Sequence, residues 1–197
     1  DQTSFTKVTA VSDVVSVSCG ADSTVCALSD GRVYAFGRNS KYQLGLATAK
    51  HSNIPRRVIG LEQITAVSCG ASHTVCIDSQ SFLWSFGLND AGQLGLNHFK
   101  TQKSPARLEF QDAEHVVCGE HHTMVLKHSG EIYACGRNSS GQLGLLNRKL
   151  ASCQLEEISV PKAGYRRITS IACGNNFSLA LSSEGVVYGI GENSLGQ

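Results

Sequence analysis

Cysteine and histidine recur close together in this sequence, at spacings that a metal ion could use. Cys69 is followed by His73, and Cys118 is followed by the pair His121 and His122. A structural zinc site needs four such ligands that converge from complementary positions. Each of these groups supplies fewer ligands than that, so a metal site would require distant parts of the chain to meet.

Two other kinds of chemistry have weaker support. Nucleophilic catalysis needs Ser or Cys beside a base and an orienting acid, and the sequence has no strained Gly-x-Ser-x-Gly turn. Segments such as Gly37-Arg38-Asn39 resemble phosphate-binding loops, but they precede no helical pattern. The helix N-terminus that binds phosphate is therefore missing. We predict no catalytic residue, no cofactor and no resident metal.

A pattern that occurs four times predicts the architecture. Each unit opens with Cys-Gly, at Cys19, Cys69, Cys118 and Cys173, and reaches Gly-x-Asn 18 residues later. The units therefore start 50, 49 and 55 residues apart. A repeat of this length is typical of a stacked or radial array, because one unit cannot bury its own apolar face.

The repeat changes the interpretation of the cysteines and histidines. The histidine position of the second and third units holds Ser23 in the first unit and Asn176 or Phe177 in the fourth, which argues against a metal ligand. Repeat positions seldom approach closely enough for a disulfide. We expect the eight cysteines to be reduced structural thiols, in an intracellular setting, cytoplasmic or nuclear.

Residues 64–113 show what one unit contains. Ile64–Cys69 and His73–Ile77 have the alternation of strands, Phe82–Phe86 predicts a third strand, and Arg107–Phe110 a shorter fourth. Residues that favour turns separate these segments. Four strands joined by tight turns are the content of one propeller blade. We therefore predict an all-β propeller with four roughly 50-residue, four-stranded blades.

The repeat boundaries leave both ends of the array open. The repeats span approximately residues 14–63, 64–112, 113–167 and 168–197, the last incomplete, with residues 3–13 as the closing strand of a preceding unit. We expect a piece of a longer propeller or a half that needs a partner chain, with a closed four-bladed ring as the alternative. Self-association through open blade edges is a further possibility. The connection from Gly144 to Cys173 is longer than its counterparts and is either a surface loop or a binding loop.

Composition argues against two classes of partner. The formal net charge is +1, and no basic run is present, although Arg56-Arg57 and Arg166-Arg167 could still meet in space. Binding to nucleic acid or chromatin needs a concentrated basic face, so we do not expect it for this segment. We also expect no membrane partner, because no stretch approaches the roughly 20 apolar residues that cross a bilayer.

The repeat resembles the regulator of chromosome condensation (RCC1-like) repeat family. Residues 118–123 read Cys-Gly-Glu-His-His-Thr, and residues 130–144 read Gly-Glu-Ile-Tyr-Ala-Cys-Gly-Arg-Asn-Ser-Ser-Gly-Gln-Leu-Gly. The resemblance implies a β-propeller that usually has seven blades, and a core histidine whose ring is hydrogen-bonded. The founding member is a guanine-nucleotide exchange factor that uses a propeller face and a β-wedge. The segment from Leu145 to Arg167 is the only candidate for a wedge here. Many relatives use the repeats only as docking domains.

We therefore expect a non-enzymatic protein-interaction module that docks a protein partner through its blade loops. The alternative is a guanine-nucleotide exchange factor for a Ran-like small GTPase. The candidate contact residues vary within the repeated frame of the loops, although each one could also be an ordinary solvated side chain. They are Arg38, Lys41, Tyr42, Leu88, Asp90, Arg137 and Glu192.

Overall fold

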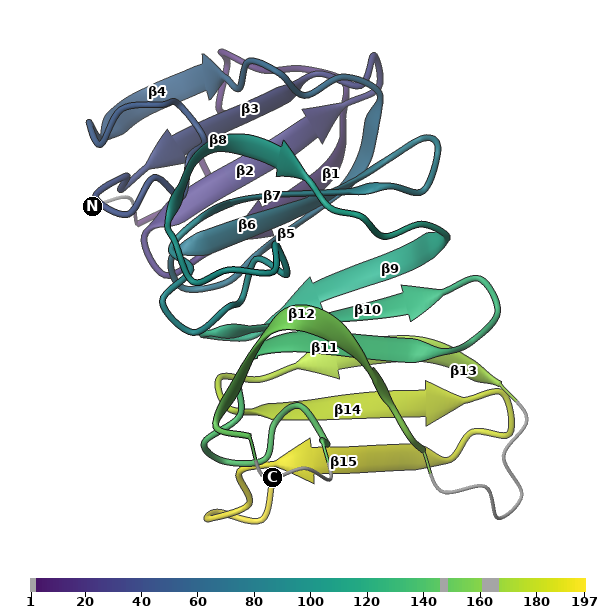
Figure 1. The fold of residues 1–197 in the computed structure, drawn as a ribbon. Helices are drawn as coiled ribbons and strands as arrows, with labels where there is room; N and C mark the ends of the chain where they lie inside the picture. Colours follow the sequence, from purple (N-terminus) through teal and green to yellow (C-terminus); the bar gives the residue numbers. More distant parts are fainter. Residues whose placement is uncertain (1–2, 146–148, 161–166) are drawn as a thin grey trace.

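The molecule consists of four antiparallel sheets that follow one another along the chain (Figure 1). The structure is a computed structural model that describes residues 3–145, 149–160 and 167–197. Within each sheet the strands lie in chain order, so every sheet is a simple meander. The described residues form strands, turns and loops only, and none of them belongs to a helix long enough to cross a membrane. The predicted all-β propeller architecture with repeated blades is confirmed.

The strand bounds show the repeat directly. The first blade contains β1 (Val14–Cys19), β2 (Ser23–Leu28), β3 (Val33–Gly37) and β4 (Ser52–Arg57). The second contains β5 (Ile64–Cys69), β6 (His73–Asp78), β7 (Leu83–Gly87) and β8 (Gln102–Arg107). The third contains β9 (Ala113–Cys118), β10 (His122–Lys127), β11 (Ile132–Arg137) and β12 (Ala151–Ile158). The fourth contains β13 (Ile168–Cys173), β14 (Phe177–Ser182) and β15 (Val187–Gly191).

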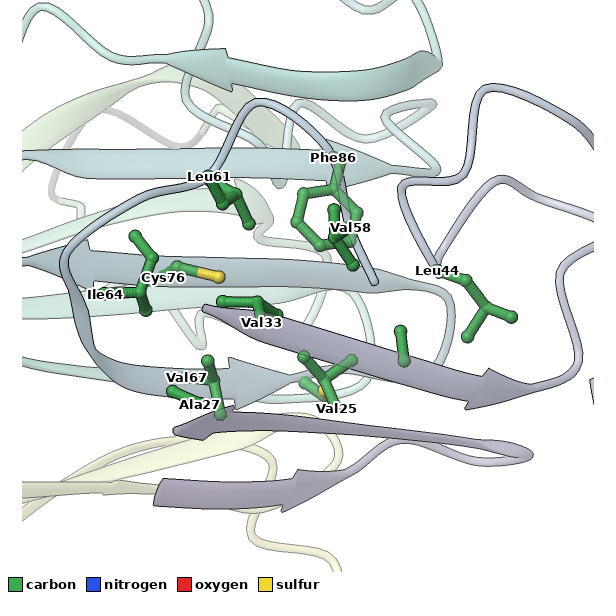
Figure 2. Close-up of a cluster of buried hydrophobic side chains, with 12 residues drawn as sticks. Val25, Ala27, Val33, Leu44, Val58, Leu61, Ile64, Val67, Cys76 and Phe86 are labelled. Carbon is green, nitrogen blue, oxygen red and sulfur yellow. The ribbon is translucent and has the colours of Figure 1, made fainter. Parts of the chain in front are cut away.

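The apolar core lies between neighbouring blades. Figure 2 shows one cluster, in which Val58 of the first blade lies beside Phe86 of the second, and Leu44 of the first blade belongs to the same cluster. All three side chains are fully buried. Burying one such side chain stabilises the fold by about 1.5–3 kcal/mol. Because the cluster draws on two blades, each blade depends on its neighbour for stability.

The first blade exposes the side that a preceding blade would cover. Val14 and Val17 of β1 are 40% and 63% exposed, whereas the equivalent Ile64 and Val67 of β5 are 1% and 8% exposed. β5 contacts β1, and β9 and β13 continue the series. The first and fourth blades lie at opposite ends of the arc in Figure 1. The alternative of a closed four-bladed ring is therefore wrong for this structure. The seven-blade total stays a prediction.

The outer strands differ most from the sequence prediction. The predicted strand Arg107–Phe110 lies too far along the chain, because β8 pairs Gln102 with Gly87 and ends where Arg107 pairs with Trp84. The next residue, Leu108, turns into the core and donates its N–H to the carbonyl of Leu83 at 2.9 Å.

Two other predictions on outer segments have mixed outcomes. The long connection after Gly144 contains β12, which has eight residues against six in β4 and β8. Part of the extra length therefore extends an outer strand, and residues 146–148 and 161–166 lie outside the described residues. Residues 3–13 form no strand in the structure, and their role in closing a preceding unit stays a prediction.

The glycine at the last or next-to-last position of each third strand provides a test of this fold. Gly136 has φ +110°, and a Cβ there would lie 2.5 Å from the carbonyl oxygen of His121. Gly136→Val should lower the free energy of unfolding by more than about 3 kcal/mol. Arg137→Ala should change it by less than about 0.5 kcal/mol. Urea unfolding of both variants measures the difference, and equal midpoints would contradict the assignment.

Candidate protein-binding face

Two kinds of connection meet at one end of every blade. In the first blade, Ser23 at the start of β2 pairs with Gly37 at the end of β3, and Gly37 pairs with Ser52 at the start of β4. The turn between the first two strands and the loop after the third therefore lie at the same end. We call this end of the propeller the loop face. The described residues of the loops on it are 38–51, 88–101, 138–145 with 149–150, and 192–197.

A backbone hydrogen bond fixes the start of each loop against the turn of its own blade. Arg38 N–H donates to the carbonyl of Asp22 at 2.7 Å, and Leu88 N–H donates to Ser72 at 2.9 Å. Arg137 and Glu192 repeat this bond, to His121 and Asn176, at 2.8 and 2.9 Å. Arg38, Leu88, Arg137 and Glu192 therefore occupy equivalent places on the four blades while their side chains differ in size and charge.

A buried asparagine shapes each complete loop from inside. The Oδ1 of Asn39 accepts a hydrogen bond from Leu44 N–H at 2.9 Å, and its Nδ2 donates to the carbonyls of Thr48 and Lys50 at 2.6 and 3.2 Å. Asn39 is fully buried, and Asn89 and Asn138 make the corresponding bonds in the next two blades. One side chain thus satisfies backbone groups from both ends of the loop, which gives the loop a defined shape.

A hydroxyl from the next blade then ties the loop to its neighbour. Thr74 Oγ1 donates to the carbonyl of Gln43 at 2.9 Å, across the boundary between the first and second blades. Thr123 and Ser178 repeat this bond across the next two boundaries, to Gln93 and Gln142, at 2.8 and 3.0 Å. The loop face is therefore held by bonds between blades as well as within them.

The repeated histidine completes this bond. His73 Nε2 lies 3.0 Å from Thr123 Oγ1. The Thr123 hydroxyl already donates its one hydrogen to the carbonyl of Gln93. The imidazole must therefore be the donor in this contact, from Nε2–H. His122 makes the equivalent contact with Ser178 at 2.8 Å. The core histidine with a hydrogen-bonded ring, which the family resemblance implies, is present in these two blades.

The repeated thiols also take part in contacts between blades. Cys69 Sγ lies 3.6 Å from the carbonyl oxygen of Ser18, and Cys118 Sγ lies 3.5 Å from that of Ser68. All eight cysteines are free, and burial raises the pKa of Cys69 and of Cys118 to about 12. A thiol with so high a pKa is a poor nucleophile and a poor metal ligand at neutral pH.

The predicted contact residues all lie at this face, spread over four blades; Arg137 is the last residue of β11, and the others lie in the loops. Arg38 forms a 3.1 Å ion pair with Asp22, and both side chains are more than half exposed. Tyr42 has φ +61° and its half-buried ring lies 5.4 Å from the Lys103 ammonium of the next blade. Lys41 is exposed beside it.

The remaining candidates differ in exposure. Asp90 is exposed, whereas Leu88, Arg137 and Glu192 are half-buried. Asn176 Nδ2 donates to Glu192 Oε2 at 3.3 Å. The structure brings these residues to one face but into no single cleft. Their role in binding therefore stays a prediction.

The Cys-Gly turns enclose a hollow of about 410 Å³ that the sequence did not reveal. All four turns contribute to its lining, together with Glu120 and Asn175. Ala71 N–H donates to the carbonyl of Glu120 at 3.2 Å, and Glu120 N–H donates to that of Asn175 at 3.1 Å, so neighbouring turns are joined around the hollow. In the sequence, the only sign of this hollow was that the two positions after each Cys-Gly vary from unit to unit.

The structure also brings together a Ser-His-Glu group on the opposite face, which the sequence did not predict. Ser81 Oγ lies 3.3 Å from His128 Nε2, and His128 Nδ1 lies 4.0 Å from Glu114 Oε2. The histidine is more than half exposed, and Arg167 already pairs with Glu114 at 3.1 Å. An acid neutralised by arginine and a solvated base do not activate a serine. This group is better explained as a contact between neighbouring hairpins.

Comparison with known proteins agrees with the architecture. The sequence matches the family model described as RCC1-like domain over residues 1–197. The crystal structure of human WBSCR16 has a TM-score of 0.81 and 25% identity, over 92% of this chain and 49% of that chain. Yeast RCC1 (Prp20) bound to Kap60 has a TM-score of 0.80 and 24% identity, over 96% of this chain and 45% of that one.

A second structure of Prp20p from Saccharomyces cerevisiae gives a TM-score of 0.77 at 24% identity, over 96% of this chain and 47% of that one. The chain thus spans about half the length of these structures. The search of curated proteins gave no match.

The buried histidines predict a pH-dependent stability. Burial lowers the pKa of His73 to about 3 and that of His122 to about 4. The unfolded chain, with a histidine pKa of about 6.5, binds these protons more readily, so stability is complete above that pH and falls as the pH drops toward 4. Below pH 6 each histidine should cost about 1.4 kcal/mol per pH unit. Urea unfolding between pH 7.5 and 5 measures this slope.

His73→Phe is the matched variant, because Phe177 stands at the same position in the fourth blade. It should reduce the pH slope by the share of one histidine. A variant with the slope of the parent protein would show that His73 becomes protonated in the folded state, and that the assigned hydrogen bond is wrong.

Proposed function

Because the chain belongs to the RCC1-like domain family, we propose that it is a non-enzymatic module that docks a protein partner through the loop face. The repeated bonds of Asn39, Thr74 and His73 support this proposal, because they hold the loops in place without using the outward side chains. Binding sites favour variable loops on a rigid frame. We also propose that the blades form part of a larger propeller.

The variation at equivalent positions is the observation on which the proposal rests. Arg38 and Arg137 are cationic, Leu88 is apolar and Glu192 is acidic, although their backbones start the four loops in the same way. Arginine and tyrosine are common anchors of protein interfaces, and Tyr42 lies in the same loop as Arg38. A partner that touches several blades would meet a different group on each one.

Guanine-nucleotide exchange on a Ran-like small GTPase is the second candidate. The structure of Saccharomyces cerevisiae Prp20p was described together with the binding of that protein to Gsp1p and histones. At 24% identity this likeness supports a common fold only. The described part of the segment 145–167 contains the outer strand β12. We therefore favour docking, and the expectation that this segment does not bind chromatin stays a prediction.

Partner capture from a cell lysate tests the loop face. Arg38→Glu combined with Arg137→Glu should remove at least about nine tenths of the captured partner, because both reversals lie on that face. Lys127→Glu is the control, since Lys127 ends β10 at the opposite end of its blade. Quantitative mass spectrometry measures the capture. Equal capture by the parent protein and the loop-face variant would contradict the proposal.

The exchange alternative has a separate readout. Release of a fluorescent guanine nucleotide from Ran should be no faster with this chain than without it. Acceleration of about tenfold or more, lost in the loop-face variant, would favour exchange over docking.

A further inference from the structure

A groove on the outer edge of the first blade gathers positive charge. It has a volume of about 490 Å³ and lies between the end of the loop 38–51 and strand β4. Lys50, His51, Arg56 and Arg57 line it. Within the described part of the chain, the lysine and both arginines form no ion pair. Asp30, on whose pKa Arg57 acts, is already bound by Arg32.

The walls of this groove are held in place. Asn39 Nδ2 donates to the carbonyls of Thr48 and Lys50, which fixes the loop wall. Asn39 N–H donates to Nδ1 of His51 at 3.1 Å. The neutral His51 ring therefore carries its proton on Nε2, which remains as a further donor at the groove. A groove of this kind presents donors without having to be assembled by a ligand.

In the third blade, the cation at the equivalent place is paired with a carboxylate of the same blade. Asn138 holds the carbonyl of Lys149 as Asn39 holds that of Lys50. Lys149 Nζ then lies 2.9 Å from Glu156 Oε1. Glu156 stands four residues after Ser152, which pairs with Gly136. In the first blade the same place, four residues after the Ser52 that pairs with Gly37, holds an arginine.

In the second blade, the arginine of the outer strand packs against an aromatic ring. Arg107, equivalent to Arg57, stacks on the ring of Phe82 with the guanidinium carbon 3.5 Å from the ring centre. The neighbouring position there is Ala106. The first blade thus combines three cations where its neighbours have an internal carboxylate or an aromatic partner.

We propose that this groove binds an acidic, extended segment of a protein partner, whose carboxylates take the role that Glu156 has in the third blade. This site shares the end of the loop 38–51 with the loop face and extends from there onto the outer strand β4. Leu46 lines the groove and is half-buried, so an apolar side chain between the acidic ones also finds a contact. That apolar contact favours a peptide over a nucleic acid.

We expect ion pairs, rather than backbone pairing with an added strand, to provide most of the affinity. Pro55 lies in the middle of β4 and has no N–H to offer to an added strand. Affinity should therefore fall as salt rises. The competing explanation is that the arginines only keep an outer strand from pairing with other chains, which is a common use of edge charges.

Fluorescence anisotropy with a labelled peptide of alternating glutamate and valine tests the proposal. The protein should bind this peptide, and raising the salt from about 50 to 200 mM should weaken binding severalfold. Arg56→Glu combined with Arg57→Glu should weaken it by at least about tenfold. The fold tolerates acidic residues here, because the third blade has Glu156 and Glu157 at these positions. Arg56→Gln with Arg57→Gln is a milder second variant.

The control is Arg38→Glu combined with Lys41→Glu, which changes the charge of the same blade equally but on the loop face. It should bind the peptide as the parent protein does, whether or not the loop face docks a partner. Absence of binding by the parent protein, equal loss in both double variants, or tighter binding of a short oligothymidylate would each overturn the proposal.

Discussion

The bond between neighbouring blades is the interaction on which this structure depends. A hydroxyl such as that of Thr123 accepts a hydrogen bond from His73 of the preceding blade and donates one to the carbonyl of Gln93. Buried polar groups are costly when unpaired, so the two boundaries with a histidine need both the donor and the acceptor in place. Gly70 leaves room for the ring, because a Cβ there would overlap Cε1 of His73.

The inner part of each blade was predictable because local chemistry and repeat position agree there. The predicted strand Ile64–Cys69 has the observed bounds, and His73–Ile77 is one residue short. The outer strand was misplaced because β8 contains Pro105 and polar residues, so its sequence lacks the alternation of a half-buried strand. Its bounds come from pairing with β7, which a local pattern does not encode.

The candidate face was predictable only in part. Residues such as Arg38 and Asp90 stand out in sequence because they vary within a repeated frame. The approach of Lys103 to Tyr42 joins two blades and has no local signal. The pair Arg56-Arg57 was visible as a basic dipeptide. Only the strand register shows that Arg56 stands where the third blade has Glu156.

The frame and the surface can vary independently because they use different atoms. The side chains of Asn39 and Thr74 form hydrogen bonds inside the protein. Lys41 takes part in this frame through its backbone N–H, which donates to Gln43 Oε1. A change of the Lys41 side chain therefore alters what the face presents without leaving a buried group unpaired. Such a frame lets one fold serve different partners.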